Sequence, residues 1–197
     1  MRLVLGVFAA WREFLFFLIG VTCVLVVALG RTAPVAAQVM ATEPEVKAAF
    51  LYNFARFVRW PEETLARAAA FPICVLGRDP IEPMLASAIA GKRVGDLPIV
   101  TKRLDAGSSP SDCRILFISS SAENHLDEVL KDVRGAGVLT VADIDDFAER
   151  GGMIRFRLDG KRMRLDVNIE AAEGAHLKIS SQLLKLANIV PEEGGAP

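Results

Sequence analysis

The hydrophobic positions of this chain form one long run near its start and then a series of short periodic segments. The run extends from Phe14 to Gly30 without a charged residue, follows Arg2 and Arg12, and leads to the small residues at 35–37. A basic start, an apolar middle and a small-residue exit are typical of a secretory signal peptide, which predicts cleavage after residue 37. The alternative is an uncleaved inner-membrane anchor, because a run of 17 residues is at the short end of what spans a bilayer.

Helical spacing begins after a short leader at 38–43. Thr42 and Glu45 have the spacing of a capping box, and Trp60-Pro61 disfavours continued helix, so we predict a helix from Pro44 to Arg59. Lys47 falls within the apolar stripe, but in the first turn, where we expect its amine to reach water. The stripe consists of Val46, Phe50, Phe54, Phe57 and Val58.

Short strands and helices alternate in the rest of the chain. Strands are predicted at 71–76, 97–104, 113–118, 138–141, 153–158 and 163–169, and helices at 80–90, 122–133, 144–149 and 180–190. Asp159-Gly160 between the last two strands is a hairpin signal. The pattern predicts an α/β domain over 44–190 with a mixed, mostly parallel sheet flanked by helices, a C-terminal antiparallel hairpin and a tail at 191–197.

Charge argues against nucleic acid as a partner. The full chain has 23 basic and 24 acidic residues. Removal of residues 1–37 leaves 20 and 23, a net charge of −3. Phosphate binding needs a basic surplus, which this chain lacks.

Two cysteines, Cys74 and Cys113, follow the predicted signal peptide. In an oxidising compartment such a pair is most simply one structural disulfide. A redox-sensing pair is the alternative. The spacing is not C-x-x-C, which argues against a thiol oxidoreductase.

Motifs that carry chemistry are few. Gly77 lies at a strand–loop–helix bend. This bend is either a tight turn or a phosphate-binding loop, and the signal for the loop is weak because no G-x-G-x-x-G is present. Asp143, Asp145 and Asp146 lack the rest of a calcium loop and are interpreted as a solvated helix start. No metal-ligand spacing occurs, and no cofactor is expected.

Three further residues have a structural and a functional interpretation. Tyr52 and Trp60 lie off the centre of the first apolar stripe, either at the edge of the core or as interface anchors. Asn168 ends the last predicted strand. It either caps the following turn, which we favour, or contacts a ligand at the sheet edge.

The order and spacing of several blocks resemble the YfiR family over residues 44 to 190. These blocks are 46–54 with Trp60-Pro61, 74–77, 113–118, 139–141, 151–154, 167–169 and 177–184. The resemblance implies a periplasmic, non-enzymatic, Rossmann-like α/β protein that is often dimeric. It maps the family's cysteine pair onto Cys74 and Cys113. Some members carry a second pair near the Gly151-Gly152 turn, which is absent here, so redox control through that bridge does not transfer.

The resemblance also implies partners. A periplasmic repressor of the family binds the periplasmic sensor region of an inner-membrane diguanylate cyclase, and an outer-membrane lipoprotein sequesters it. Cyclic-di-GMP and biofilm matrix then rise. Other membrane sensors, such as histidine kinases, are alternative partners.

We therefore expect a periplasmic negative regulator that is not an enzyme. A small-ligand-binding module is the second hypothesis, and a hydrolase assembled from Ser119–Ser121 or Ser180–Ser181 with a histidine is the third. The candidate partner or ligand contacts are Tyr52, Trp60, Gly77, Asn168 and Lys178.

Overall fold

The computed structural model describes residues 41–66, 68–105 and 107–191. The predicted signal peptide, the first half of the predicted leader and all but the first residue of the predicted tail lie outside the described residues. Among the described helices, none is both long enough and apolar enough to cross a membrane.

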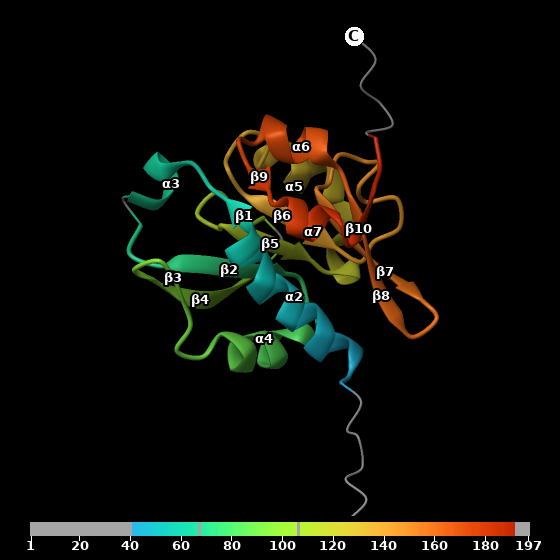
Figure 1. Cartoon of the computed structure of the whole chain (residues 1–197), viewed down its shortest axis with the longest axis horizontal. Coiled ribbons are helices and arrows are strands. Elements are labelled where there is room, and N and C mark those ends of the chain that lie inside the picture. Colours follow the sequence, from blue (N-terminus) through green and yellow to red (C-terminus); the bar gives the residue numbers. More distant parts are fainter. Residues whose placement is uncertain (1–40, 67, 106, 192–197) are drawn as a thin grey trace, which may run out of the picture. The chain divides into compact units, whose positions relative to one another are not determined.

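The described chain forms an eight-stranded sheet with the strand order β10-β8-β7-β6-β5-β2-β4-β3 and a separate two-stranded pair, β1-β9 (Figure 1). The strands of the large sheet are β2 (Phe71–Leu76), β3 (Arg93–Val94), β4 (Leu97–Leu104), β5 (Ile115–Ile118), β6 (Leu139–Ala142), β7 (Ile154–Asp159), β8 (Arg162–Val167) and β10 (Ala187–Ile189). The small pair is β1 (Val58–Arg59) and β9 (Lys178–Ile179).

Most strand pairs in the large sheet are parallel. Strands β4, β2, β5, β6 and β7 run in the same direction, while β8 returns antiparallel to β7 and β3 antiparallel to β4. The predicted fold class, a mostly parallel sheet with a late antiparallel hairpin, is therefore confirmed. The hairpin turn is Gly160-Lys161, where Gly160 has a φ of 61°.

The helices of the described chain are short apart from the first. They are α2 (Glu43–Phe57), α3 (Glu62–Ala66), α4 (Ile81–Ile89), the 3-10 helix η1 (Ser120–His125), α5 (Leu126–Asp132), α6 (Ile169–Gly174) and α7 (Ser181–Leu184). Helix α2 begins with the predicted capping box, in which the Thr42 backbone N–H donates to the Glu45 carboxylate at 2.7 Å.

Helices α2 and α4 cover one face of the sheet, where they lie side by side (Figure 1). Leu51 and Phe54 of α2 and Leu85 of α4 are fully buried there against Ile73 and Val75 of β2. Burial of such side chains contributes about 1.5–3 kcal/mol each and holds α2 in a fixed position on the sheet.

The second face is covered by η1, α5 and the turn segment after β6. Leu126 and Phe147 are fully buried there with Cys74, Leu116 and Ile118, the strand residues that alternate with those of the first face. This period of two assigns successive residues of β2 and β5 to opposite cores.

Two predicted helices are wrong. Residues 144–149 form turns, because Asp146 has a positive φ of 55° that a right-handed helix does not allow. The helix predicted over 180–190 is only α7, after which the chain extends as β10 and pairs with β8. Helix α6 forms after β8, where the sequence pattern predicted no helix.

Candidate functional site

The order of the parallel strands reverses at β2. The chain passes from β2 to β4 on one side and then returns to β5 on the other side. In open α/β sheets, ligands bind at this switch point, outside the carboxyl ends of the strands. We define the switch-point site by the residues that follow β2 and β5: Gly77, Arg78, Asp79, Ser119 and Ser121.

The two loops of the switch-point site are hydrogen-bonded to each other. The Ser119 hydroxyl donates to the Arg78 carbonyl oxygen at 2.9 Å, and the Arg78 backbone N–H donates to the Ser121 hydroxyl at 2.9 Å. Ser119 is buried, with 1% of its surface exposed. The polar groups that would contact a ligand in this crevice therefore bind each other.

Gly77 permits this close approach. Its φ is 88°, and a Cβ at this position would lie 2.5 Å from the Ser121 hydroxyl oxygen. Of the two interpretations of this glycine, the structure displays the tight turn, packed against the serine loop. No residue with a side chain fits at position 77 without strain.

Carboxylates surround one amine beside the switch-point site. Lys47 of α2 is 6% exposed, and its Nζ lies 2.5 Å from Asp143 Oδ2 and 2.5 Å from Glu43 Oε1. Burial lowers the pKa of Lys47, but its hydrogen bonds to Asp143 and Glu43 outweigh burial and raise the pKa overall. The expectation that this amine reaches water is wrong, because α2 packs on a face of the sheet and brings Lys47 to Asp143, just after β6.

Asp79 belongs to the same electrostatic group. Burial and the charge of Asp143 raise its pKa, although its hydrogen bond from the Ile81 N–H and the charge of Lys47 act in the opposite direction. Asp79, Asp143 and Glu43 outnumber the one buried amine. This excess of carboxylates disfavours phosphate at the switch point.

The sequence suggested that Asp143, Asp145 and Asp146 begin a helix, but in the structure they do not. Asp143 binds Lys47, and Asp145 forms an ion pair with Arg155 of β7. Among the described residues, no group of three histidine, cysteine or acidic side chains is placed to hold a metal ion.

Asn168 is fully buried after β8. Its side-chain oxygen accepts from the Ala171 N–H at 2.8 Å and caps α6, while its amide nitrogen donates to the Ala148 carbonyl at 2.8 Å. Both hydrogen bonds are to the protein backbone. Asn168 thus caps the segment that follows it, as the structural interpretation predicted, and it also ties the turn after β6 to the start of α6.

The two aromatic candidates have different environments. Trp60 is 7% exposed, packs edge-on against Phe71 with ring centres 4.9 Å apart, and donates its indole N–H to the Arg114 carbonyl. Tyr52 is half-buried on α2, with the cations of Arg56 and Lys92 each 5.9 Å from its ring centre. Trp60 is a core residue, and only Tyr52 keeps an accessible ring.

Lys178 lies apart from the other candidates. It is exposed on β9, where it pairs with Arg59 of β1. It borders a groove of about 540 Å³ between α6 and α7. The groove is lined by Ile169, Ala172, Glu173, His176, Leu177, Lys178, Ile179 and Leu184.

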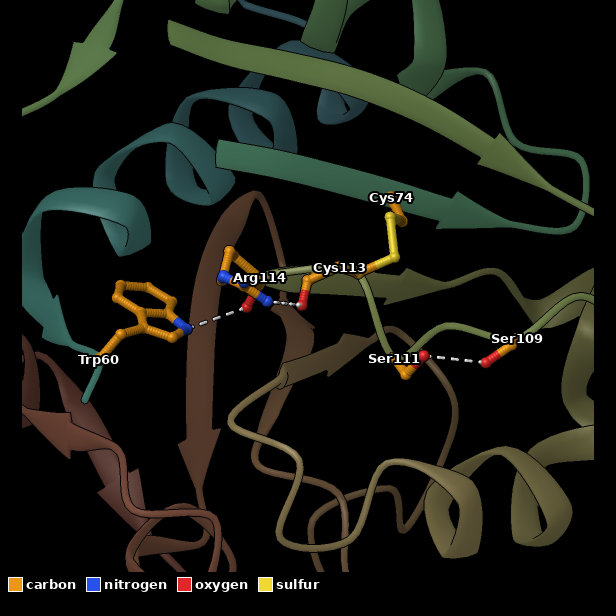
Figure 2. The surroundings of a disulfide bond; sticks show 6 residues. All are labelled: Trp60, Cys74, Ser109, Ser111, Cys113 and Arg114. Carbon is orange, nitrogen blue, oxygen red and sulfur yellow. Dashed lines mark hydrogen bonds between the residues drawn. A yellow bond between two sulfur atoms is a disulfide. The ribbon is translucent and has the colours of Figure 1, made fainter. Parts of the chain in front are cut away.

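The predicted cysteine pair is bonded in the structure (Figure 2). Cys74 in β2 and Cys113, just before β5, are both fully buried, and their Cα atoms are 5.9 Å apart. Arg114 follows immediately and accepts the Trp60 indole hydrogen bond with its carbonyl oxygen. The bridge therefore links β2, at which the strand order reverses, to the segment that leads into β5.

A group of charged residues on the β7–β8 hairpin was not among the candidates. Arg155, Arg157 and Asp159 of β7 lie opposite Asp166, Arg164 and Arg162 of β8, so all six share one face. The signal was present in the sequence, because charged residues alternate on both sides of Asp159-Gly160. Only the cross-strand register shows that these charged residues lie on the same face of the hairpin.

The comparison with curated proteins gives no match. The comparison with family models gives one, described as YfiR/HmsC-like, over residues 44–188. The matched range begins inside α2 and ends within β10, so it includes the switch-point site, the disulfide and the charged hairpin. The chain belongs to the YfiR/HmsC-like family.

Proposed function

We propose that this chain is a periplasmic regulatory binding protein that represses a membrane-bound signalling enzyme by binding its periplasmic sensor region. The enzyme we propose first is a diguanylate cyclase. The observation that carries the proposal is the family match over residues 44–188. The buried Cys74–Cys113 disulfide supports it, because such bonds persist in oxidising compartments such as the periplasm.

The switch-point site supports binding through a surface rather than catalysis in a crevice. Its serine hydroxyls are engaged with the Arg78 backbone, and carboxylates surround the buried Lys47 amine beside it. A repressor of this kind acts by differential binding. It holds the inactive state of the sensor, and an outer-membrane lipoprotein that sequesters it would release the enzyme.

The test is binding of the purified oxidised chain to the periplasmic segment of a membrane cyclase or kinase encoded beside it. We expect a complex at micromolar concentration and lower cyclic-di-GMP in cells that express both proteins. A neighbouring kinase that binds would keep the regulatory role and remove the cyclase from the proposal. Absence of binding to every such segment would refute the proposal.

A second candidate function rests on the groove beside Lys178. This groove, with a volume of about 540 Å³, an apolar lining and a few polar groups, has the size of a small-ligand site. In this case the chain would be a periplasmic ligand-binding module that serves a histidine kinase or an outer-membrane receptor. A thermal-shift screen tests this, since a ligand at 100 times its Kd adds about 2.7 kcal/mol of stability. A flat response to nucleotides, amino acids and sugars would count against it.

A further inference from the structure

The hairpin β7–β8 extends beyond the strands beside it (Figure 1). On one side, β6 pairs only with Ile154 and Arg155 of β7. On the other side, β10 pairs only with residues from Leu165 to Val167 of β8. Residues 156–164, which we call the arm, are therefore a two-stranded ribbon whose two outer edges have no strand partner among the described residues.

The arm concentrates positive charge. It contains four cations and one carboxylate, whereas the whole chain has a net charge of −1. The carboxylate, Asp159, lies 3.4 Å from Arg164 Nε. The cations are Arg157, Lys161, Arg162 and Arg164.

The register places two of these cations against each other. Arg157 and Arg164 are directly opposite across the two strands. Like charges in this position destabilise a strand pair. Asp166 compensates in part, because it is 3% exposed and its carboxylate accepts from Arg157 Nε at 3.0 Å. Within the described chain, Lys161 and Arg162 have no ion-pair partner, so the tip carries the surplus charge.

The opposite face of the arm is apolar. Phe156 and Leu165 anchor it to the core, and Phe156 stacks on Phe54 of α2 with ring centres 5.8 Å apart. Leu158 lies opposite Met163 nearer the tip and is 50% exposed, one of the few large apolar side chains on the described surface. The arm thus offers cations, an apolar contact and unpaired backbone edges together.

This combination fits an extended acidic polypeptide segment. Its backbone can pair with a free strand edge, while its carboxylates meet the arginines. A second copy of the arm fits poorly, since two basic ribbons repel each other and charged edges discourage self-pairing. An anionic lipid surface would use the cations but not the alternating N–H and C=O groups of the edge.

We propose that the arm is the surface on which this protein docks an acidic, extended segment of its partner. The inference rests on the proposed function in one respect only, that the partner is a protein. It identifies the contact region and the chemistry of the segment that binds there.

The first experiment uses a fluorescein-labelled peptide of alternating glutamate and threonine, followed by fluorescence anisotropy. The arm variant is Lys161→Glu with Arg162→Glu. The matched control, Lys102→Glu with Lys131→Glu, makes the same change in net charge at exposed positions outside the arm. We expect the arm variant to bind about tenfold more weakly and the control to bind like the wild type, with wild-type affinity falling as salt rises.

Equal affinity of the arm and control variants would overturn the proposal, as would absence of peptide binding by the wild type. Vesicles containing phosphatidylglycerol are titrated in parallel. Binding to vesicles but not to the peptide assigns the arm to lipid and also overturns the proposal. All substituted side chains are exposed, so circular dichroism should show unchanged folding in each variant.

A second measurement repeats the comparison with the periplasmic segment of the membrane protein encoded beside this chain. If wild type and arm variant bind the segment equally, the arm proposal fails and the proposed function stands. If neither binds any segment, the proposed function fails. The peptide titration alone then decides whether the arm binds an acidic extended segment.

Discussion

Lys47 and Asp143 lie 96 positions apart in the chain and form a buried ion pair in which Nζ is 2.5 Å from Oδ2. The pair fastens the first turn of α2 to the end of β6. Replacing Lys47 by methionine keeps most of the side-chain volume but leaves Asp143 without its cation. We expect Lys47→Met to lower the free energy of unfolding by about 3 kcal/mol, measured by urea denaturation at pH 7.

The second partner provides the control. The double variant Lys47→Met with Asp143→Asn removes the unpaired charge, so it should recover a large part of the loss. Lys102→Met, at an exposed position, should change stability by less than about 0.5 kcal/mol. If the double variant loses as much stability as Lys47→Met and Asp143→Asn lose when summed, the two side chains do not interact.

Asp79 gives a prediction about pH. Burial and the charge of Asp143 raise its pKa above the ordinary value of 3.8, so the folded state disfavours its ionised form. An asparagine at this position would keep the oxygen that accepts from the Ile81 N–H and remove the charge. We expect Asp79→Asn to raise the free energy of unfolding at pH 7 by about 0.5 kcal/mol, because the group is only half-buried.

The sign of the pH dependence follows from the raised pKa. The advantage of Asp79→Asn should be complete above the folded-state pKa. It should shrink as pH falls through that value and vanish below the unfolded-state value of 3.8. Urea denaturation at several pH values between 3 and 7 measures it, with the exposed Asp112→Asn as the matched change in charge. An advantage that grows on acidification would contradict the assigned direction.

The central strands could be predicted from the sequence because burial on both faces makes them continuous apolar runs. Strand β2 is such a run and has the predicted bounds, Phe71–Leu76. Strand β4 also has the predicted bounds, Leu97–Leu104, although half of its residues are exposed and it is not a continuous apolar run. The C-terminal helix was wrong because Leu183 and Leu184 suit helical spacing, whereas the extended form of Ala187–Ile189 depends on pairing with β8. Long-range pairing of this kind leaves no local signal.

In the candidate site, too, some features could be predicted from the sequence and others could not. The cysteine pair could be predicted, since only two cysteines follow the predicted signal peptide. The burial of Lys47 could not, because its partner comes from a segment that the sequence assigned to a solvated helix start. Trp60 was ambiguous for a similar reason: its position just after the first helix does not reveal that the Arg114 carbonyl accepts its indole N–H.

The disulfide closes a loop with a sequence separation of 39. If it is a structural bond, Cys74→Ser and Cys113→Ser should each lower the free energy of unfolding by about 2–5 kcal/mol. The double replacement of both cysteines by alanine removes the bond without a lone thiol and should cost a similar amount. A stability that barely changes, together with altered binding of the partner segment, would identify the pair as a redox switch instead.

Glycine is required at position 77 for two separate reasons. Its φ is 88°, and a Cβ at this position would lie too close to the Ser121 hydroxyl oxygen. Gly160 has a comparable φ of 61°, but an added Cβ there would meet nothing within 4 Å, so it isolates the backbone contribution. We expect Gly160→Ala to cost about 1 kcal/mol and Gly77→Ala about 2–3 kcal/mol in urea denaturation, since the second adds a steric contact to the strain.

The contact can be removed without changing the backbone. Ser121→Ala takes away the hydroxyl that lies 2.5 Å from the added Cβ, so Gly77→Ala should cost less in the Ser121→Ala background than in the wild type. The remaining cost should approach that of Gly160→Ala. An unchanged cost would show that the Ser121 hydroxyl does not contribute to the penalty and that the backbone conformation of Gly77 accounts for it.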